Sequence, residues 1–293
     1  MKPTAWSAAA ATLAAFAAVS CAGPNGPTPG PPPPGASNVL VGAGDIAVCG
    51  SSATQATASL LDNIEGTVST AGDNVYDNGT FDEFMRCYEP TWGRHKSRTR
   101  PSPGNHDYAH GPSGYFAYFG ASAGPPGLGY YSFRVGSWHV LSMNSNVAAH
   151  VGSPQFAWML QELTDNSARC TAAIWHHPVF SSGPNGPQGE MRDVWRAMVL
   201  ADVDVVIVGH DHLYERFAPL DAEGLPSARG IQQFTVGTGG ASLYQFQRIA
   251  PGSEARASVH GVLKLTLNEG SYDWEFVAVP GVPFTDRGRG DCH

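Results

Sequence analysis

Five short strand-like runs along the chain each end directly before a cluster of Asp, Asn or His residues. The runs and the first residues after them are 39–44 before Asp45, 67–72 before Asp73, 98–104 before Asn105, 170–175 before His176, and 203–209 before His210. Helix-like patterns lie between several of these runs, and such alternation is typical of an α/β domain. Because functional sites form at the carboxyl ends of strands in such sheets, we expect the five clusters to lie together on one rim.

The remaining patterns complete one domain. We expect helices over residues 54–64, 81–89, 154–163 (with Ser153 as N-cap) and 189–200, a β-hairpin over 129–146, and strands over 231–237, 262–268 and 272–279. The chain has no internal repeat and no second linker. These patterns therefore predict one α/β domain with an antiparallel or mixed region toward the C-terminus.

Composition excludes some classes of function. Hydrophobic residues make up 42% of the 293-residue chain, which is enough for a large core. The formal net charge is −8, so the chain lacks the basic surface of a nucleic-acid-binding protein. The one basic cluster, residues 94–100, is interpreted as a solvated loop, because short charge runs are usually solvated.

The N-terminus has the pattern of an export signal. Lys2 precedes an apolar run that is too short to span a bilayer and that ends in small residues, so residues 1–21 are predicted to be a signal peptide. Two interpretations stay open: ordinary cleavage near Cys21, or a lipoprotein signal in which Cys21 carries a lipid anchor. Residues 22–37 are rich in Pro and Gly and are predicted to be an extended tether. Residues 38–293 are then the folded domain, and the protein is expected to be secreted, periplasmic or lipid-anchored at the cell surface.

Four cysteines remain if Cys21 is an anchor. They are Cys49, Cys87, Cys170 and Cys292. In an exported chain they predict two disulfides, for which three connectivities are open. No spacing between them is typical of a zinc ribbon.

The residue types in the five clusters indicate metal chemistry. Asp, Asn and His supply oxygen and imidazole ligands for first-row transition metals. Gly precedes the first polar residue of four clusters and allows the backbone to approach a ligand closely. His210 and His212 would point the same way in an extended segment, whereas a turn could aim them at neighbouring ions. Any one cluster alone is typical of an ordinary turn or loop, but five in succession favour a metal site.

Five sequence blocks resemble those of a known family. They are GDI (44–46), GDNVY (72–76), GNHD (104–107), AIWH (173–176) and GHDHLYER (209–216). In order and spread they resemble the calcineurin-like metallophosphoesterases and, through Tyr76 and the last block, the purple acid phosphatases. The resemblance covers roughly residues 38–279. It implies an α/β fold of the α+β type, a four-layer-like sandwich of two mixed β-sheets flanked by helices.

The resemblance also implies two metal ions bridged by Asp73. The first ion would be held by Asp45, Tyr76 and His212, and the second by Asn105, His176 and His210. Two carboxylates and a phenolate suit a trivalent ion such as Fe³⁺, whereas an amide with two imidazoles suits Zn²⁺, Mn²⁺ or Fe²⁺.

The implied reaction is hydrolysis of small phosphomonoesters by attack of a metal-bound hydroxide, with Asp73 and Asn105 in the catalytic set. His106 would lie beside the leaving group as general acid, or would instead orient Asn105. Two alternatives stay open: a phosphodiesterase with the same metals, acting on cyclic nucleotides or glycerophosphodiesters, and a surface binding protein without catalysis. The oligomeric state is not predicted.

The chain departs from the purple acid phosphatase pattern after His176. Relatives often carry substrate-facing histidines on the following loop, but residues 181–190 contain none. Either His177 takes the place of one of them or the phosphate pocket is built differently. The aromatic residues of 108–120, among them Tyr115, Phe116 and Phe119, either line a substrate cleft or pack in the core.

Overall fold

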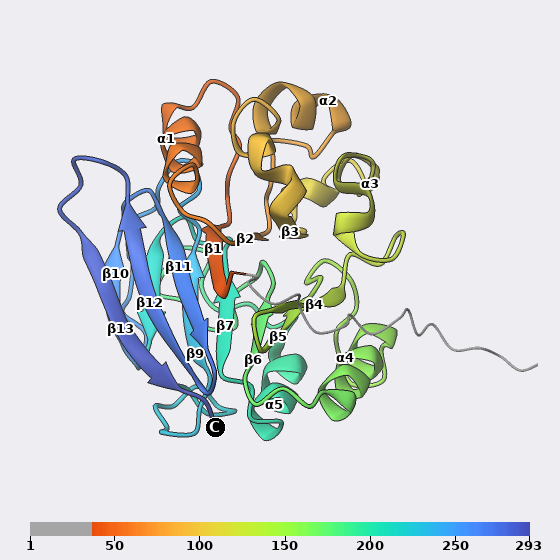
Figure 1. The fold of residues 1–293 in the computed structure, drawn as a ribbon, viewed down its shortest axis with the longest axis vertical. Helices are drawn as coiled ribbons and strands as arrows, with labels where there is room; N and C mark the ends of the chain where they lie inside the picture. Colours follow the sequence, from red (N-terminus) through yellow and green to blue (C-terminus); the bar gives the residue numbers. More distant parts are fainter. Residues whose placement is uncertain (1–36) are drawn as a thin grey trace, which may run out of the picture. The chain divides into compact units, whose positions relative to one another are not determined.

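The computed structural model describes residues 37–293, which form two mixed β-sheets with helices on their outer sides (Figure 1). The first sheet contains, in spatial order, β13 (Thr285–Asp291), β12 (Ser271–Ala278), β11 (Gly261–Asn268), β1 (Val39–Ala43), β2 (Thr67–Ala71) and β3 (Thr99–Ser102). The second contains β10 (Ser253–Ala257), β8 (Tyr214–Phe217), β9 (Gln232–Val236), β7 (Val205–Val208), β6 (Thr171–Ile174), β5 (Trp138–Ser142) and β4 (Tyr131–Val135). The predicted signal peptide, the anchor at Cys21 and nearly all of the tether lie outside the described residues.

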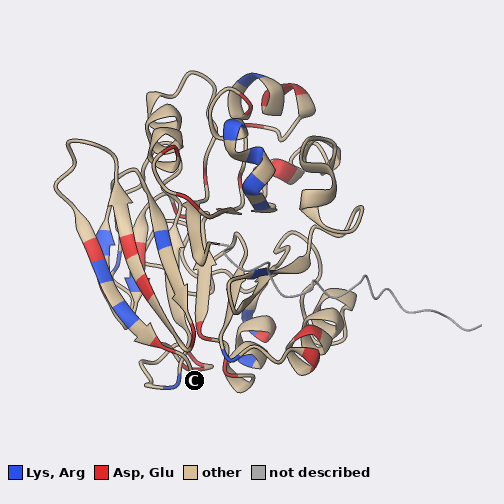
Figure 2. Ribbon diagram, in the orientation of Figure 1, with Lys and Arg blue, Asp and Glu red and all other residues tan. Residues whose placement is uncertain are grey.

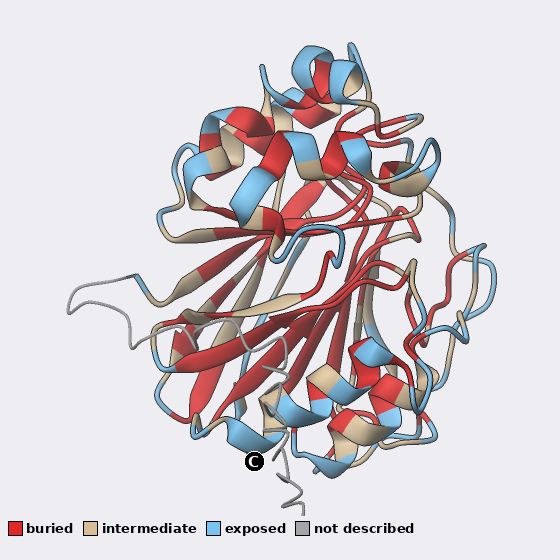
Figure 3. Ribbon diagram, turned by 90° about the vertical axis from the view of Figure 1, so that its right-hand side faces the viewer, coloured by how far each residue is buried: buried red, intermediate tan, exposed pale blue. Residues whose placement is uncertain are grey.

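The helices form the two outer layers. They are α1 (Ser52–Leu61), α2 (Phe81–Glu83) with its π-helical continuation (Phe84–Tyr88), α3 (Ser113–Phe119), α4 (Pro154–Asp165) and α5 (Arg192–Leu200), with short 3₁₀ segments at Trp92–Arg98, His106–Tyr108 and Gly120–Ala123. Their buried faces point toward the sheets and their exposed faces outward (Figure 3). The predicted sandwich of two mixed sheets flanked by helices is confirmed.

Two apolar clusters hold the layers together. The larger one contains residues from both sheets, such as Val41 and Phe234, and also Leu61 of α1 and Tyr115 of α3. The second joins the second sheet to α4 and α5 and includes Trp195. Burial of apolar surface on both faces of the central strands explains why these strands read as nearly continuous apolar runs in the sequence.

The parallel direction of the central strands places their carboxyl ends at the same edge of each sheet. In the first sheet β1, β2 and β3 are parallel neighbours, and in the second sheet β5, β6, β7 and β9 are parallel neighbours. The predicted hairpin is present as β4 and β5, and Ser153 caps α4 by accepting a hydrogen bond from the N–H of Phe156 at 3.2 Å. Five strands therefore end beside the polar clusters that follow them in the sequence.

Three strands were not recognised separately in the sequence: β8, β10 and β13. The β13 sequence contains Gly288 and Gly290, which normally weaken a strand. Here a Cβ at either position would lie 2.3 Å from the ring of Trp274 or Tyr272, so the glycines make room for these rings. The sequence pattern alone does not reveal this cross-strand packing.

The interpretation of residues 94–100 as a loop is wrong, because most of them form the 3₁₀ segment before β3. Arg94 pairs with Asp62 at 2.7 Å, and Arg98 donates to the carbonyl of Leu61 at 2.7 Å, at the end of α1. Basic side chains at a helix C-terminus satisfy its free carbonyls. Elsewhere, on β12 and β13, basic and acidic residues are interspersed (Figure 2).

The described cysteines form two disulfides, Cys49–Cys87 and Cys170–Cys292. This selects one of the three connectivities that the sequence left open. The first bridge ties the segment after Asp45 to the π-helical turn that follows α2. None of the described helices is long and apolar enough to cross a membrane.

Candidate metal centre

All seven predicted ligand residues lie at the ends of strands from both sheets. Asp45 follows β1, Asp73 and Tyr76 follow β2, Asn105 follows β3, His176 follows β6, and His210 and His212 follow β7. Asp45, Asp73 and His176 are fully buried or nearly so, whereas Asn105 and His210 are half-buried. The centre is therefore deep on one side and accessible on the other.

The first group of donor atoms surrounds the phenol oxygen of Tyr76. This hydroxyl lies 2.9 Å from Asp45 Oδ1, 3.1 Å from Asp73 Oδ2 and 3.2 Å from His212 Nε2. Ligands at about 2.1 Å from one ion are about 3.0–3.4 Å from one another. The distances in this group are those of atoms that could share one ion.

The second group surrounds Nε2 of His176. This nitrogen lies 3.0 Å from Asn105 Oδ1, 3.2 Å from Asp73 Oδ2 and 3.3 Å from His210 Nδ1. Among the donor atoms of these two groups, Asp73 Oδ2 alone is in contact with both central atoms, Tyr76 OH and His176 Nε2. The partition into two groups with Asp73 between them is the one that the sequence resemblance implies.

The backbone at the centre is strained in a way that aims the ligands. Only four described non-glycine residues have a positive φ, and three of them are Asp45 (58°), Asp73 (48°) and His210 (70°). This conformation costs energy for side chains with a Cβ and is common at functional sites. At His210 it turns the chain so that His210 and His212 face different donor groups. Of the two alternatives that the sequence left open, the turn is present and the extended segment is not.

Backbone hydrogen bonds fix one oxygen of each carboxylate. The N–H of His106 donates to Asp73 Oδ1 at 2.8 Å, and the N–H of His210 donates to Asp45 Oδ2 at 2.9 Å. The other oxygen of each carboxylate is the one that enters the donor groups. Two strand ends thereby position each carboxylate without using the oxygen that a metal would need.

The hydrogen bonds at Nδ1 show which ring nitrogen of each histidine can face a cation. Nδ1 of His176 lies 2.8 Å from the carbonyl of Ala71, and Nδ1 of His212 lies 2.8 Å from the carbonyl of Ser242. A carbonyl only accepts, so both Nδ1 atoms carry hydrogen, and each ring in its neutral form presents a lone pair at Nε2. These lone pairs face carboxylate, amide and phenol oxygens. A cation satisfies such an arrangement, so the residues fit a metal pair.

The pKa shifts in the ion-free chain also indicate a site for a cation. Burial lowers the pKa of His176, but the carboxylates of Asp73 and Asp45 outweigh it and raise that pKa to about 9. Burial and the same two carboxylates raise the pKa of the Tyr76 phenol well above its usual range. Without a cation, a proton on His176 offsets the buried charge, and Tyr76 stays a phenol. A bound metal ion would have the opposite effect on His176 and Tyr76, because it favours their deprotonated forms.

Several residues that support the centre had no role assigned from the sequence. Asp107, fully buried, accepts hydrogen bonds from the N–H of Gly104 at 2.8 Å and the side-chain amide of Asn74 at 2.9 Å. It therefore joins the turn that carries Asn105 to the turn that carries Asp73. Tyr244 stacks on the His212 ring with centroids 4.1 Å apart. Tyr244 comes from the irregular segment after β9, which carries no recognisable motif.

The segment after β6 is held by acidic residues of the last sequence block. Asp211 accepts from the hydroxyl of Ser181 and from the N–H of Asn185 at 3.0 Å. Glu215 accepts from the N–H of Ser182 at 2.9 Å. The non-ligand residues of that block thus fix the loop that begins beside His176.

His106 lies at the rim with its side chain 35% exposed. Its Nδ1 is 2.6 Å from the carbonyl of Asp77, its Nε2 is 4.0 Å from Asp73 Oδ2, and its ring packs on Tyr76 with centroids 4.4 Å apart. No hydrogen bond joins its ring to the side chain of Asn105. This geometry favours contact with a ligand at the rim over orientation of Asn105.

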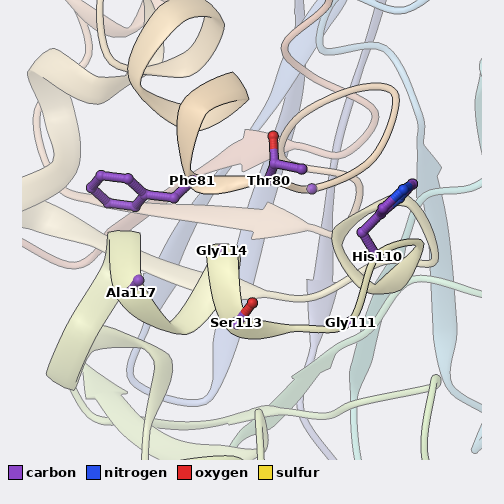
Figure 4. A pocket seen from close by; sticks show the side chains of 8 residues that line it. Thr80, Phe81, His110, Gly111, Ser113, Gly114 and Ala117 are labelled. Atoms are coloured by element: carbon purple, nitrogen blue, oxygen red, sulfur yellow. The ribbon is translucent and has the colours of Figure 1, made fainter.

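The aromatic residues of 108–120 pack in the core and do not line a cleft. Tyr115 and Phe119 are buried, and Phe116 packs against the same cluster. The opposite side of α3 borders a cavity of about 250 Å³ that contains none of the predicted ligands (Figure 4). It is lined by Gly79 and Thr80 just before α2, by Phe81 at its start, and by His110, Gly111, Ser113, Gly114 and Ala117.

Comparison with known proteins agrees with this geometry. The family profile of the calcineurin-like phosphoesterases matches residues 39–214, more than half of the chain. The chain belongs to this family. Members of this family of phosphoric ester hydrolases use a binuclear metal site, in agreement with the two donor groups around Asp73.

Curated relatives of this phosphoesterase include purple acid phosphatases. An uncharacterized protein of Mycobacterium tuberculosis is 28% identical over 252 residues, covering 68% of this chain and 45% of that protein. Human acid phosphatase type 7 is 27% identical over 163 residues (47% of this chain, 36% of the relative), and purple acid phosphatase 21 of Arabidopsis thaliana is 31% identical over 117 residues (38% and 26%). The chain spans about half the length, or less, of these relatives.

Solved structures share the fold. A purple acid phosphatase from yellow lupin seeds superposes with a TM-score of 0.66 at 19% identity, over 88% of this chain and 55% of that one. GAP50 of Plasmodium, described as the anchor in the inner membrane complex, superposes with a TM-score of 0.63 at 15% identity, over 85% and 87%. At these identities the similarity shows the fold alone.

Gly104→Ala tests whether the tight approach of the strand ends builds the metal centre. A Cβ at Gly104 would lie 2.2 Å from the N and the Oδ1 of Asp73, so alanine must displace that carboxylate. We expect metal affinity to fall by about tenfold or more, measured as metal content after gel filtration. Gly189→Ala is the control, because nothing lies within 4 Å of its Cβ position. Equal metal content in both variants would contradict the account.

Proposed function

We propose that the chain is a metal-dependent phosphatase that hydrolyses small phosphomonoesters at a two-metal centre. The observation that carries the proposal is the convergence of two donor groups on Asp73 Oδ2, with Tyr76 OH at 3.1 Å and His176 Nε2 at 3.2 Å. The names of the curated relatives, acid phosphatase type 7 and purple acid phosphatase 21, support a monoester as substrate.

Each donor group suits a different ion. Asp45, Asp73 and the Tyr76 phenol with His212 form a hard, anionic set that fits Fe³⁺, whereas the amide of Asn105 with His176 and His210 fits Zn²⁺, Mn²⁺ or Fe²⁺. When bound, the two ions would supply a nucleophile from water and offset the negative charge that develops on the phosphoryl group. The chain's own contribution is to fix the donors before substrate arrives. It does so through strained turns, backbone N–H donors to the carboxylates, and carbonyl acceptors behind two of the imidazoles.

His106 is proposed to move the proton to the leaving group. Its Nδ1 donates to the carbonyl of Asp77, which leaves Nε2 as the atom that can take up and release a proton toward the rim. The packing of its ring on Tyr76 keeps Nε2 near Asp73. The amide of Asn105, on the neighbouring half-buried position, remains in the second donor group.

A non-catalytic role is the second candidate, because GAP50, described as an anchor, shares the fold along most of its length. The complete set of seven donors argues against this role, since a centre without chemistry has no need for all of them. A metal-free protein that releases no phosphate after metals are added back would favour the binding role.

Export is also proposed, with residues 1–21 as signal, 22–37 as tether and 38–293 as catalytic domain. The two disulfides support an oxidising compartment. Recovery of the protein with reduced cysteines from the cytoplasmic fraction would contradict this assignment.

The substrate class is tested by comparing p-nitrophenyl phosphate with bis(p-nitrophenyl) phosphate on the metal-loaded protein. We expect a higher kcat/KM with the monoester and loss of activity after chelation. A higher kcat/KM with the diester would reject the monoesterase and favour the phosphodiesterase alternative, because the same donors serve both reactions.

His106→Asn tests the proton role separately from metal binding. We expect kcat with p-nitrophenyl phosphate to fall about 10²–10⁴-fold while the metal content stays unchanged. His110→Asn serves as the control, because His110 is exposed and outside the centre. If His106→Asn retains full kcat, His106 has no part in proton transfer.

A further inference from the structure

His177 lies beside the second donor group but belongs to neither group described above. One ring nitrogen each of His176, His177 and His210 lie within 4.8 Å of one another. The His177 ring is 4.5 Å from that of His210 and 5.0 Å from that of His176, centroid to centroid. Like Asn105, His106 and His210, His177 is half-buried, so it lies on the accessible side of the centre.

The hydroxyl of Ser145, which lies just after β5, forms hydrogen bonds with both the backbone and the ring of His177. The backbone N–H of His177 donates to Ser145 Oγ at 3.2 Å, and the same oxygen lies 2.8 Å from Nδ1 of the His177 ring. Trp175 also donates its indole N–H to the His177 carbonyl at 2.9 Å. Both the backbone and the ring of His177 are therefore fixed in place.

The single hydrogen of the Ser145 hydroxyl decides the tautomer of His177. Ser145 is buried, with 3% of its surface exposed, and a buried hydroxyl hydrogen needs an acceptor. Within residues 37–293 the only acceptor that the structure provides for it is Nδ1 of His177. Nδ1 must then accept, so the ring is neutral and its hydrogen is on Nε2.

This tautomer separates His177 from the metal ligands. His176 and His212 present a lone pair at Nε2, whereas His177 presents an N–H there and uses its Nδ1 lone pair on Ser145. His106 has the opposite arrangement, with its hydrogen on Nδ1 toward the Asp77 carbonyl. The rim thus holds one histidine whose Nε2 has a lone pair and one whose Nε2 carries a hydrogen.

We propose that His177 is a substrate-binding residue that donates its Nε2–H to a phosphoryl oxygen of the bound ester, and that Ser145 is the positioning residue that sets its tautomer. The proposal rests on the proposed phosphatase function and assigns to His177 a contact that no histidine of residues 181–190 can make, because that loop contains none. A neutral N–H donor suits this task, since it binds an anionic oxygen without competing for the metal ions.

The test measures the binding of inorganic phosphate to the full metal-loaded chain by titration calorimetry. We expect His177→Ala to weaken phosphate binding by about ten- to a hundredfold, the worth of a hydrogen bond to a charged group. The metal content should stay unchanged. His177→Gln, which can place an amide N–H near the position of Nε2, should recover part of the affinity. Ser145→Ala should weaken binding to an intermediate degree, because both tautomers of His177 then become populated.

His150→Ala is the matched control, because His150 is an exposed histidine in the same segment after β5. It should bind phosphate like the unmodified chain. Unchanged phosphate affinity in His177→Ala would overturn the proposal, and so would loss of metal, which would make His177 a ligand. Phosphate binding requires no turnover, so a chain that binds phosphate through His177 but hydrolyses no ester would reject only the proposed function.

Discussion

The carboxylate of Asp73 is the group on which the rest of the centre depends. Its Oδ2 faces both donor groups, while its Oδ1 is tied to the turn after β3 by the N–H of His106. To hold it there, the chain accepts a positive φ at Asp73 and glycine at position 104, where a Cβ would collide with it. The turn after β3 can approach the turn after β2 this closely because position 104 has no side chain.

The second sheet supplies the imidazole donors of the two donor groups. The first sheet contributes oxygen donors and one half-buried rim histidine, whereas β6 and β7 of the second contribute all the imidazoles of the donor groups. Hydrogen bonds from His176 to the Ala71 carbonyl and from the His210 N–H to Asp45 cross between strand ends of the two sheets. The centre thus also joins the sheets, so metal binding and the stability of the sandwich should be coupled.

The placement of the proposed donor residues could be predicted from the sequence, whereas that of the residues around them could not. Asp45, Asp73, Asn105, His176, His210 and His212 stand directly after apolar runs, or two residues later, and strand ends are local features that a sequence pattern reveals. The roles of Asp107, Ser145 and Tyr244 depend on contacts between segments distant in the sequence, such as Ser145 with His177. Similarly, β13 was not predicted, because glycine is unusual in strands. Gly288 and Gly290 are needed there to make room for aromatic rings of the neighbouring strand.

Metal analysis of the iron- and zinc-reconstituted protein, with its visible spectrum, tests the central claim most directly. The account predicts two ions per chain and a purple absorption from a phenolate on Fe³⁺, with Tyr76→Phe losing the colour but not the ions. A colourless protein with two ions would remove Tyr76 from the ligand set and leave the two-metal centre standing. Binding of at most one ion per chain, or of two ions by Asp73→Ala as tightly as by the unmodified chain, would contradict the account.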